Sequence, residues 1–262
     1  MKKSLKKMLL LVAAVLTVAS LSLPAQAATI RVIDDVAPAA QPQGSYSDVA
    51  GHWAQQWIEE ATRLGLMVGV GDGRFDPQGP VMQAQACVIA VRLADQLGWD
   101  PAPNTSIWGS LPQDSWYGVS CSRVINRFAR YGCESWQETD YSKAGQLLFV
   151  DADGKKHVSG PTTNTYYRFW PDQNATRIYV AAVVGGWTAA TDWSYSPPFP
   201  DTGSYSKFEQ DALENLFLHG VVSGYPNGYF GPADSITRAE MAVIAVNDRN
   251  RLAGVSRPAN GY

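Results

Sequence analysis

Two arginines stand at the start of helical segments, where their chemistry suits an anionic ligand. Residues 237–240 read Thr-Arg-Ala-Glu, a capping box in which Thr237 and Glu240 bond each other's backbone amides. This pattern places Arg238 at the first helical position, where a cation opposes the helix dipole. Arg177 follows Thr176 in the same way. A carboxylate or phosphate fits such a place, because the helix amides and the guanidinium fork both donate hydrogen bonds.

The alternative interpretation pairs each arginine with an acid close in the sequence. Asp234 precedes Arg238 and Asp172 precedes Arg177 by a few residues. An ion pair of this kind would give both arginines a role in stabilising the fold rather than in binding a ligand. The residue types alone leave both interpretations open.

These arginines belong to a block that occurs three times in the chain. A Phe-x-Pro sequence is followed, six residues after its proline, by an arginine or glutamine that opens an alanine-rich helix; the three copies run from Phe75 to Gln83, Phe169 to Arg177 and Phe230 to Arg238. Repeated units bury a core by stacking on their neighbours. In the first copy Met82-Gln83 lacks both the cap hydroxyl and the cation, so we expect a weak or silent site there.

Each copy is predicted to fold as helix, loop or small hairpin, helix. In the first copy one face of the first helix carries Trp53, Trp57, Ile58, Ala61 and Leu64, a spacing typical of an amphipathic helix. The second helix is expected from about residue 82 to 97, and the third copy repeats the plan with a first helix over 208–219. We expect most of these apolar residues, including the tryptophans, to form the core.

The middle copy carries an insertion between its first helix and its Phe-x-Pro block. Gly132 lies 37 residues before Phe169, whereas the matching glycines lie ten residues before Phe75 and Phe230, so about 27 residues are added. The apolar stretch 147–150 and the stretch 156–158 flank an Asp-Gly turn, which predicts a β-hairpin. A calcium loop would need further acidic ligands, which are missing, so we expect no metal site and no cofactor.

The N-terminus has the features of an export signal. Four lysines precede an apolar run from Met8 to about Leu23, and Ala25-Gln26-Ala27 supplies a cleavage pattern. A membrane anchor is the alternative, but the Pro24 break favours cleavage and no stable membrane insertion afterwards. The remaining 235 residues would carry 17 basic and 24 acidic side chains, a net charge of −7. This charge argues against binding to nucleic acid, which relies on basic surfaces.

Three cysteines, Cys87, Cys121 and Cys133, leave their pairing open. Cys121 and Cys133 are expected at opposite ends of one helix, too far apart for a disulfide. Pairing of Cys87 with one of them is one alternative, and burial as small apolar residues is the other. No cysteine and histidine spacing indicates a metal site.

The repeat resembles the S-layer homology (SLH) repeat. The matching pattern runs from Asp-Val and His-Trp-Ala through Gly-Asp-Gly-x-Phe-x-Pro to Ile-Thr-Arg-Ala-Glu; it is near-complete in the third copy, good in the first and partial in the second. The resemblance implies a mainly α fold, with three repeats in a pseudo-threefold arrangement around a central helical bundle. The expected divisions are a signal peptide at 1–27, a flexible leader at 28–45, repeats at 46–98, 111–190 and 199–252, the insertion at 134–166 and a tail at 253–262.

The resemblance also implies a function. In the SLH family, grooves between adjacent repeats bind secondary cell-wall polysaccharide, which often bears a pyruvate ketal whose carboxylate meets the arginine at this position. The resemblance therefore implies that the protein is secreted and held at the cell wall. Ligand contact carries over to Arg238 and Arg177 directly. The remaining candidate ligand-binding residues are Gln83, Thr237, Thr176, Asp48, Asp114, Asp201, Trp53, Trp116, Gly73 and Gly228. The aspartates would accept sugar hydroxyls or cap helices, the tryptophans would stack on sugars or pack in the core, and the glycines would shape turns.

Two other classes of function remain as alternatives. The sequence has no catalytic motif such as His-Glu-x-x-His, Gly-x-Ser-x-Gly or a phosphate-binding loop, and no spacing selects a pair of carboxylates for glycoside hydrolysis, so we expect no enzyme. A surface scaffold would instead bind other envelope proteins through the insertion. Peptidoglycan is a further alternative to the secondary polymer as the ligand.

Overall fold

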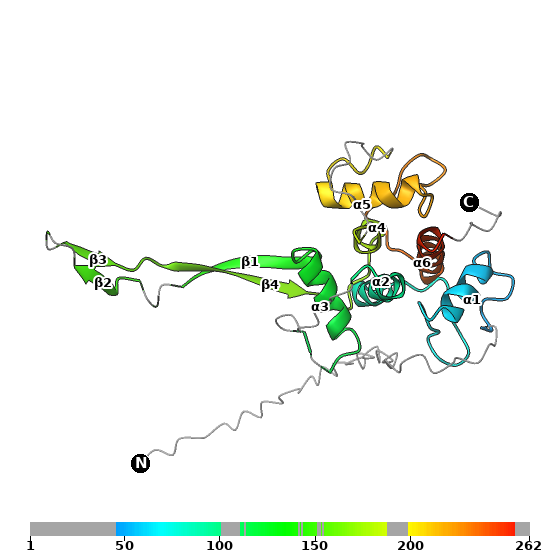
Figure 1. Cartoon of the computed structure of the whole chain (residues 1–262), viewed down its shortest axis with the longest axis horizontal. Helices are drawn as coiled ribbons and strands as arrows, with labels where there is room; N and C mark the ends of the chain where they lie inside the picture. Colours follow the sequence, from blue (N-terminus) through cyan, green and yellow to red (C-terminus); the bar gives the residue numbers. More distant parts are fainter. Residues whose placement is uncertain are drawn as a thin grey trace, which may run out of the picture. The chain divides into compact units, whose positions relative to one another are not determined.

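The computed structural model describes residues 46–100, 111–112, 114–140, 142, 144–150, 153, 155–187 and 199–254. All of them belong to the second of two compact units, residues 33–262. The predicted signal peptide and leader, and most of the tail, lie outside these residues. Within them the elements are α1 (Gln55–Arg63), α2 (Gln83–Leu97), α3 (Gly118–Arg127), β1 (Cys133–Asp140), β2 (Leu147–Val150), β3 (Lys156–Val158), β4 (Thr162–Phe169), α4 (Arg177–Gly185), α5 (Lys207–Leu218) and α6 (Arg238–Leu252) (Figure 1).

The helices of the first and third copies confirm the predicted plan and its boundaries to within a few residues. The face of α1 with Trp57, Ile58 and Ala61 is buried, and the chain turns at Gly65 with a φ of 67°. The left-handed backbone conformation that ends a helix in this way favours glycine. Helix α5 is capped by Ser206, whose side chain accepts from the amide of Glu209 in a capping box. None of the described helices has the length and apolar character needed to cross a membrane.

The second helix of each copy packs at the centre of the described structure. Helix α2 contacts both α4 and α6, while α3 packs on α2, α5 on α4 and α1 on α6 (Figure 1). The first helix of each copy therefore covers the second helix of another copy. Ala90, Ala181 and Ala242 are buried in these second helices, and their small side chains allow the helices to approach closely.

Three backbone hydrogen bonds join the three copies in a closed ring just before the central helices. The amide of Val81 donates to the carbonyl of Ile236 (3.0 Å), that of Ile236 to Ala175 (3.1 Å) and that of Ala175 to Val81 (2.7 Å). Each of these residues lies four positions after the proline of its Phe-x-Pro block. The repeated sequence thus places equivalent residues of the three copies against one another.

The insertion forms two antiparallel strand pairs. Strands β2 and β3 pair as predicted, and β1 pairs with β4 over eight residues, from Cys133 opposite Phe169 to Asp140 opposite Thr162. The prediction that Cys121 and Cys133 end one helix is wrong, because α3 ends at Arg127 and Cys133 begins β1. All three cysteines are free thiols; Cys87 and Cys121 are buried, and the Cys87 sulfur lies 3.2 Å from the Tyr179 hydroxyl.

Candidate functional site

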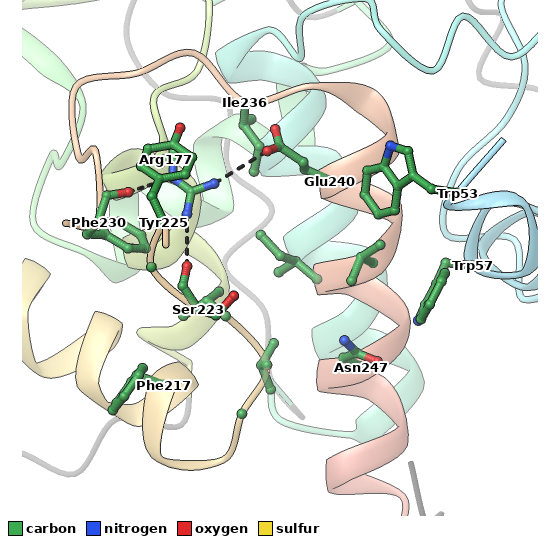
Figure 2. A pocket seen from close by; sticks show the side chains of 16 residues that line it. Trp53, Trp57, Arg177, Phe217, Ser223, Tyr225, Phe230, Ile236, Glu240 and Asn247 are labelled. Carbon is green, nitrogen blue, oxygen red and sulfur yellow. Dashed lines mark hydrogen bonds and ion pairs between the residues drawn. The ribbon is translucent and has the colours of Figure 1, made fainter. Parts of the chain in front are cut away.

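A cavity of about 420 Å³ lies where the first and third copies meet, and one residue of the second copy reaches it. The first copy contributes Trp53 and Trp57, and the second contributes Arg177. The third copy supplies the segment 220–225 and one side of α6, including Glu240 and Asn247 (Figure 2). The packing of α1 on α6 brings these walls together. We call this cavity the groove.

Arg177 is held in the groove by the third copy. Its Nε donates to the carbonyl of Phe230 (2.8 Å) and its Nη2 to that of Ser223 (3.0 Å). The guanidinium also lies over the rings of Tyr225 and Phe230, 4.8 and 4.7 Å from their centres. Its Nη1 faces Glu240 at 3.5 Å, a long contact for a charged pair (Figure 2). Arg177 thus offers this corner of its fork to a ligand.

Glu240 places a carboxylate next to Arg177. Its Oε2 accepts from the amide of Thr237 (2.9 Å) and from the Thr237 hydroxyl (3.0 Å), which confirms the predicted capping box. Its Oε1 is the atom that faces Arg177. An acceptor and a donor therefore stand side by side on the groove wall. A sugar hydroxyl, which both donates and accepts, is matched to this pair.

Aromatic and aliphatic side chains form the other walls. Trp53 keeps 45% of its surface exposed and Tyr225 keeps 38%, whereas Trp57 is buried. Val243 and Ile244 continue the apolar wall along α6. Ligand sites are commonly apolar cavities with a few polar groups that fix orientation, and the groove has this composition.

Arg238 makes hydrogen bonds equivalent to those of Arg177, but it does not line the groove. Its Nε donates to the carbonyl of Phe75 (2.8 Å), its Nη2 donates to that of Val68 (2.6 Å), and it lies over the Phe75 ring. Only 5% of Arg238 is exposed. Burial lowers the pKa of its guanidinium, opposed by the charges of Asp76, Tyr46 and Asp48. Arg238 therefore joins the third copy to the first in the interior.

The helix amides are not available to an anion, contrary to our expectation. In α4 the amides of Arg177 and Ile178 donate to the carbonyls of Asp234 (2.8 Å) and Pro232 (3.1 Å), and α6 makes the same bonds to the first copy. The third amide of each helix donates to Thr176 or Thr237. Each helix start is thus bonded to its cap and to a neighbouring copy, and only the guanidinium of Arg177 is left to meet a ligand.

Gln83 lies apart from the groove. Its side-chain nitrogen donates to the side chain of Gln173 (3.0 Å), and its backbone amide donates to the carbonyl of the same residue. Gln83 is largely buried. The structure therefore uses this position to join the first copy to the second.

The aspartates at the start of the first and third copies hold the Phe-x-Pro blocks. Asp48 accepts from the amides of Phe75 (2.9 Å) and Asp76 (2.8 Å), and Asp201 accepts from Phe230 (3.0 Å) and the residue after it (2.8 Å). Neither aspartate caps the helix that follows it, which was one of the two roles expected from the sequence. Asp114 lies exposed in a turn before α3.

The remaining predicted residues lie outside the groove. Trp116 packs edge-on against Tyr117 and borders a much smaller hollow. Gly73 and Gly228 have φ values of 66° and 85°, as the predicted turns require. No group of three histidine, cysteine or acidic side chains in the described part of the chain is placed to hold a metal ion.

Trp53 and Arg177, both expected at the site from the sequence, line the groove, but several of its other residues carried no such signal. Trp57, one turn after Trp53, is buried in the core as predicted and also lines the groove, and Glu240 is predicted from the sequence only as part of the capping box. Tyr225 and Asn247 carried no signal beyond their place in the third copy. Their convergence depends on the contact between α1 and α6, which are far apart in the sequence.

Comparisons with known proteins agree with the repeat. The profile of the S-layer homology domain matches residues 45–87 and 198–242, which hold the first and third copies. An amylopullulanase of Thermoanaerobacterium thermosulfurigenes is 22% identical over 205 residues, 76% of this chain and 9% of that protein. Cell surface glycoprotein 1 of Acetivibrio thermocellus is 33% identical over 69 residues, 24% of this chain and 3% of that protein.

The chain therefore spans less than a tenth of either relative. The SLH domain is a cell-wall-binding module rather than a catalytic one, and the match to the amylopullulanase is distant. The matches support cell-wall anchoring in general and a location at the cell surface or in the S-layer. Two segments of this chain, 45–87 and 198–242, thus match the S-layer homology domain.

Proposed function

We propose that the protein attaches non-covalently to the bacterial cell wall by binding a secondary cell-wall polysaccharide in the groove. The observation that carries the proposal is the groove itself, in which the exposed face of Trp53 stands near the paired charges of Arg177 and Glu240. Sugar rings pack on aromatic faces through their apolar side and bond through their hydroxyls. The SLH matches support the same class of ligand.

An acidic substituent on the glycan, such as a pyruvate ketal, would bind at Arg177. Its carboxylate would take the Nη1 corner that now faces Glu240 at 3.5 Å. A shorter, charge-assisted bond would replace this long contact. Glu240 would remain bonded to Thr237 and would accept a hydroxyl of the same sugar. The ligand thus needs one carboxylate and one hydroxyl on adjacent positions.

The three copies would contribute unequally to binding. Arg238 is buried with two carbonyl partners, and Gln83 is bonded to Gln173. We therefore assign contact with the ligand to Arg177, and we assign to Arg238 and Gln83 the role of joining the copies. Asp48, Asp201, Thr176, Thr237, Gly73 and Gly228 act by positioning the loops and helix starts that carry these residues.

The same proposal includes a pseudo-threefold arrangement of the copies behind an exported N-terminus. The ring of hydrogen bonds among Val81, Ala175 and Ile236 supports the symmetry. So does the cyclic packing of α3 on α2, α5 on α4 and α1 on α6. The signal peptide at 1–27 would carry the chain to the wall, where its partner is found.

Calorimetry with a short glycan from the purified wall polymer tests the proposal. Arg177→Ala should weaken binding by about 1.5–3 kcal/mol, the usual range for a hydrogen bond to a charged group. Trp53→Ala should also weaken it, since the sugar loses its apolar wall. Arg63→Ala is the matched control, because Arg63 is exposed and pairs with Glu60 within α1.

Chemical treatment of the wall separates the ligands. Mild acid, which removes a pyruvate ketal, should reduce binding of the native protein and leave binding of Arg177→Ala nearly unchanged. Binding that survives removal of the whole secondary polymer would identify peptidoglycan as the ligand. Equal losses for Arg177→Ala and Arg63→Ala would place the ligand outside the groove.

A surface scaffold is the second candidate function. Six of the eleven large apolar side chains that are exposed in the described residues lie in the insertion or just beyond it: Trp136, Leu148, Val150, Val158, Tyr166 and Trp170. Such concentration is typical of an interaction surface. It favours a protein contact in addition to wall binding.

A further inference from the structure

Strands β1 and β4 form a ribbon whose faces and edges are largely open. We define the ribbon as residues 133–140 and 162–169. In the described part of the chain its sheet consists of these two strands alone, side by side in Figure 1. Seven of the eight residues of β1 are exposed, as are five of the eight in β4. A two-stranded sheet is at best marginally stable in water, and three or more strands or a covering helix are usually needed.

A stack of side chains stiffens one face of the ribbon. Trp170, Arg168, Trp136 and Tyr166 follow one another in this stack, with the Arg168 guanidinium 5.0 Å from the Trp170 ring and 5.6 Å from the Trp136 ring. Trp136 and Tyr166 are nearly parallel at 5.5 Å. Each inner ring face is thus covered by a neighbour. A sugar platform needs free ring faces, so this stack suits a polysaccharide poorly.

The two strands differ in charge. Strand β1 carries Glu134, Glu138 and Asp140, and two of these carboxylates accept from the indole nitrogens of Trp170 (3.1 Å) and Trp136 (3.0 Å). The six residues 162–167 of β4 are uncharged threonine, asparagine and tyrosine. Carboxylates protect the edge of β1 against pairing with another strand, whereas residues 162–167 of β4 carry no charge that would do so.

We propose that β4 pairs antiparallel with β4 of a second copy of this chain about a twofold axis. The resulting sheet has the order β1, β4, partner β4, partner β1. The uncharged residues 162–167 of its two β4 strands meet at the centre, and its acidic β1 strands form the outer edges. Pairing through β1 would instead bring six carboxylates together, and like charges opposite each other destabilise a strand pair. The acidic outer edges end the sheet at a dimer.

The antiparallel direction also accounts for the apolar end of the insertion. The Thr162 end of one β4 lies beside the Phe169 end of its partner. The exposed Leu148, Val150 and Val158 lie beyond Thr162, so they come alongside the base of the partner ribbon. Burial of these side chains would add apolar contact at both ends of the interface. A dimer would also carry two grooves, and this consequence alone rests on the proposed function.

Two residues that face each other at the middle of the ribbon provide a matched test. Thr165 in β4 pairs with Gln137 in β1, and both are exposed. Thr165→Glu puts a negative charge at the centre of the proposed dimer contact, whereas Gln137→Glu puts the same charge on the outer strand. Sedimentation velocity of the full-length protein at micromolar concentration gives the oligomeric state. Far-UV circular dichroism and thermal melting establish that both variants are folded.

The native protein and Gln137→Glu should sediment as dimers. Thr165→Glu should raise the dissociation constant of the dimer about tenfold or more, because residue 165 lies at the middle of β4 and the two added charges come close together across the axis. A monomeric native protein, or equal effects of the two variants, would overturn the proposal. So would a change in tryptophan fluorescence with wall glycan that Trp136→Ala abolishes, since the ribbon would then be a polysaccharide surface.

Discussion

Arg177 and Arg238 occupy equivalent positions and make equivalent bonds, yet only Arg177 reaches the groove. Each arginine donates to the carbonyl of a Phe-x-Pro phenylalanine and to a second carbonyl seven residues before it, Ser223 or Val68. Arg177 keeps one corner toward Glu240 and the groove, whereas Arg238 is enclosed near Asp76. One repeated motif therefore serves adhesion between copies in both places and can serve ligand binding in one.

The difference arises from what lies outside the motif. Beside Arg177, the packing of α1 on α6 brings Trp53 and Trp57 opposite the third copy and leaves the groove between them. Arg238, the first residue of α6, instead lies against the loop that holds Phe75. A motif match thus locates an arginine but does not decide whether its guanidinium faces a ligand.

The largest effect that separates the two arginines concerns stability. Arg238→Ala leaves the carbonyls of Phe75 and Val68 without a donor in a buried place, which should cost about 3 kcal/mol of unfolding free energy. Arg177→Ala should cost only about 1–2 kcal/mol, because water in the groove can reach the carbonyls of Phe230 and Ser223. Urea unfolding of both variants measures the difference. Equal losses would mean that the two arginines have the same structural role.

A smaller effect on stability is expected at Gln83, which occupies the position of the two arginines in the first copy. Gln83→Ala removes the bond to Gln173 and should lower stability by about 0.5–1.5 kcal/mol, the usual net value of such a bond. Glycan affinity should stay unchanged, because Gln83 does not line the groove. Unfolding and calorimetry on the same preparation separate the two effects. A loss of affinity as large as that of Arg177→Ala would show that the first copy binds after all.

The helices and their starts could be predicted from the sequence because their signals are local. The apolar residues that predict α1, and the two residues of the capping box at Thr237, each lie within a few positions of one another. The pairing of β1 with β4 gave no such signal, since seven residues of β1 are exposed and show no apolar alternation. The inner hairpin was found because its apolar strands flank an Asp-Gly turn.

The site was predicted in part for the same reason. Arg177 and Trp53 stood out in the repeat, but the hydrogen-bond acceptors of the first helix amides could not be predicted. Their acceptors, such as the carbonyls of Asp234 and Gly79, belong to neighbouring copies and are brought close only by the closed ring of three. Contacts of this range depend on the packing of whole repeats, which no local pattern records.

The smallest effect concerns Asp48, which bonds the amide of Phe75 and so holds the loop whose carbonyl accepts from Arg238. Burial opposes ionisation of Asp48, yet hydrogen bonds from the amides of Phe75, Asp76 and Asp48 itself hold its pKa below the usual range. A carboxylate with a lowered pKa stabilises the fold above its unfolded pKa, and this contribution is lost as the pH falls through the folded pKa.

Asp48→Asn should therefore lower stability near neutral pH by a few tenths of a kcal/mol, a small value because Asp48 is close to solvent. The same variant should lose less stability on acidification below about pH 4, since it no longer takes up that proton. Urea midpoints at neutral and acid pH measure both changes, with Asp114→Asn, at an exposed turn, as the control. If Asp48→Asn keeps the full acid sensitivity of the native protein, the carboxylate does not hold the Phe75 loop by its charge. The support of Arg238 would then come from the backbone of that loop, and the two arginine sites would differ only in their access to the groove.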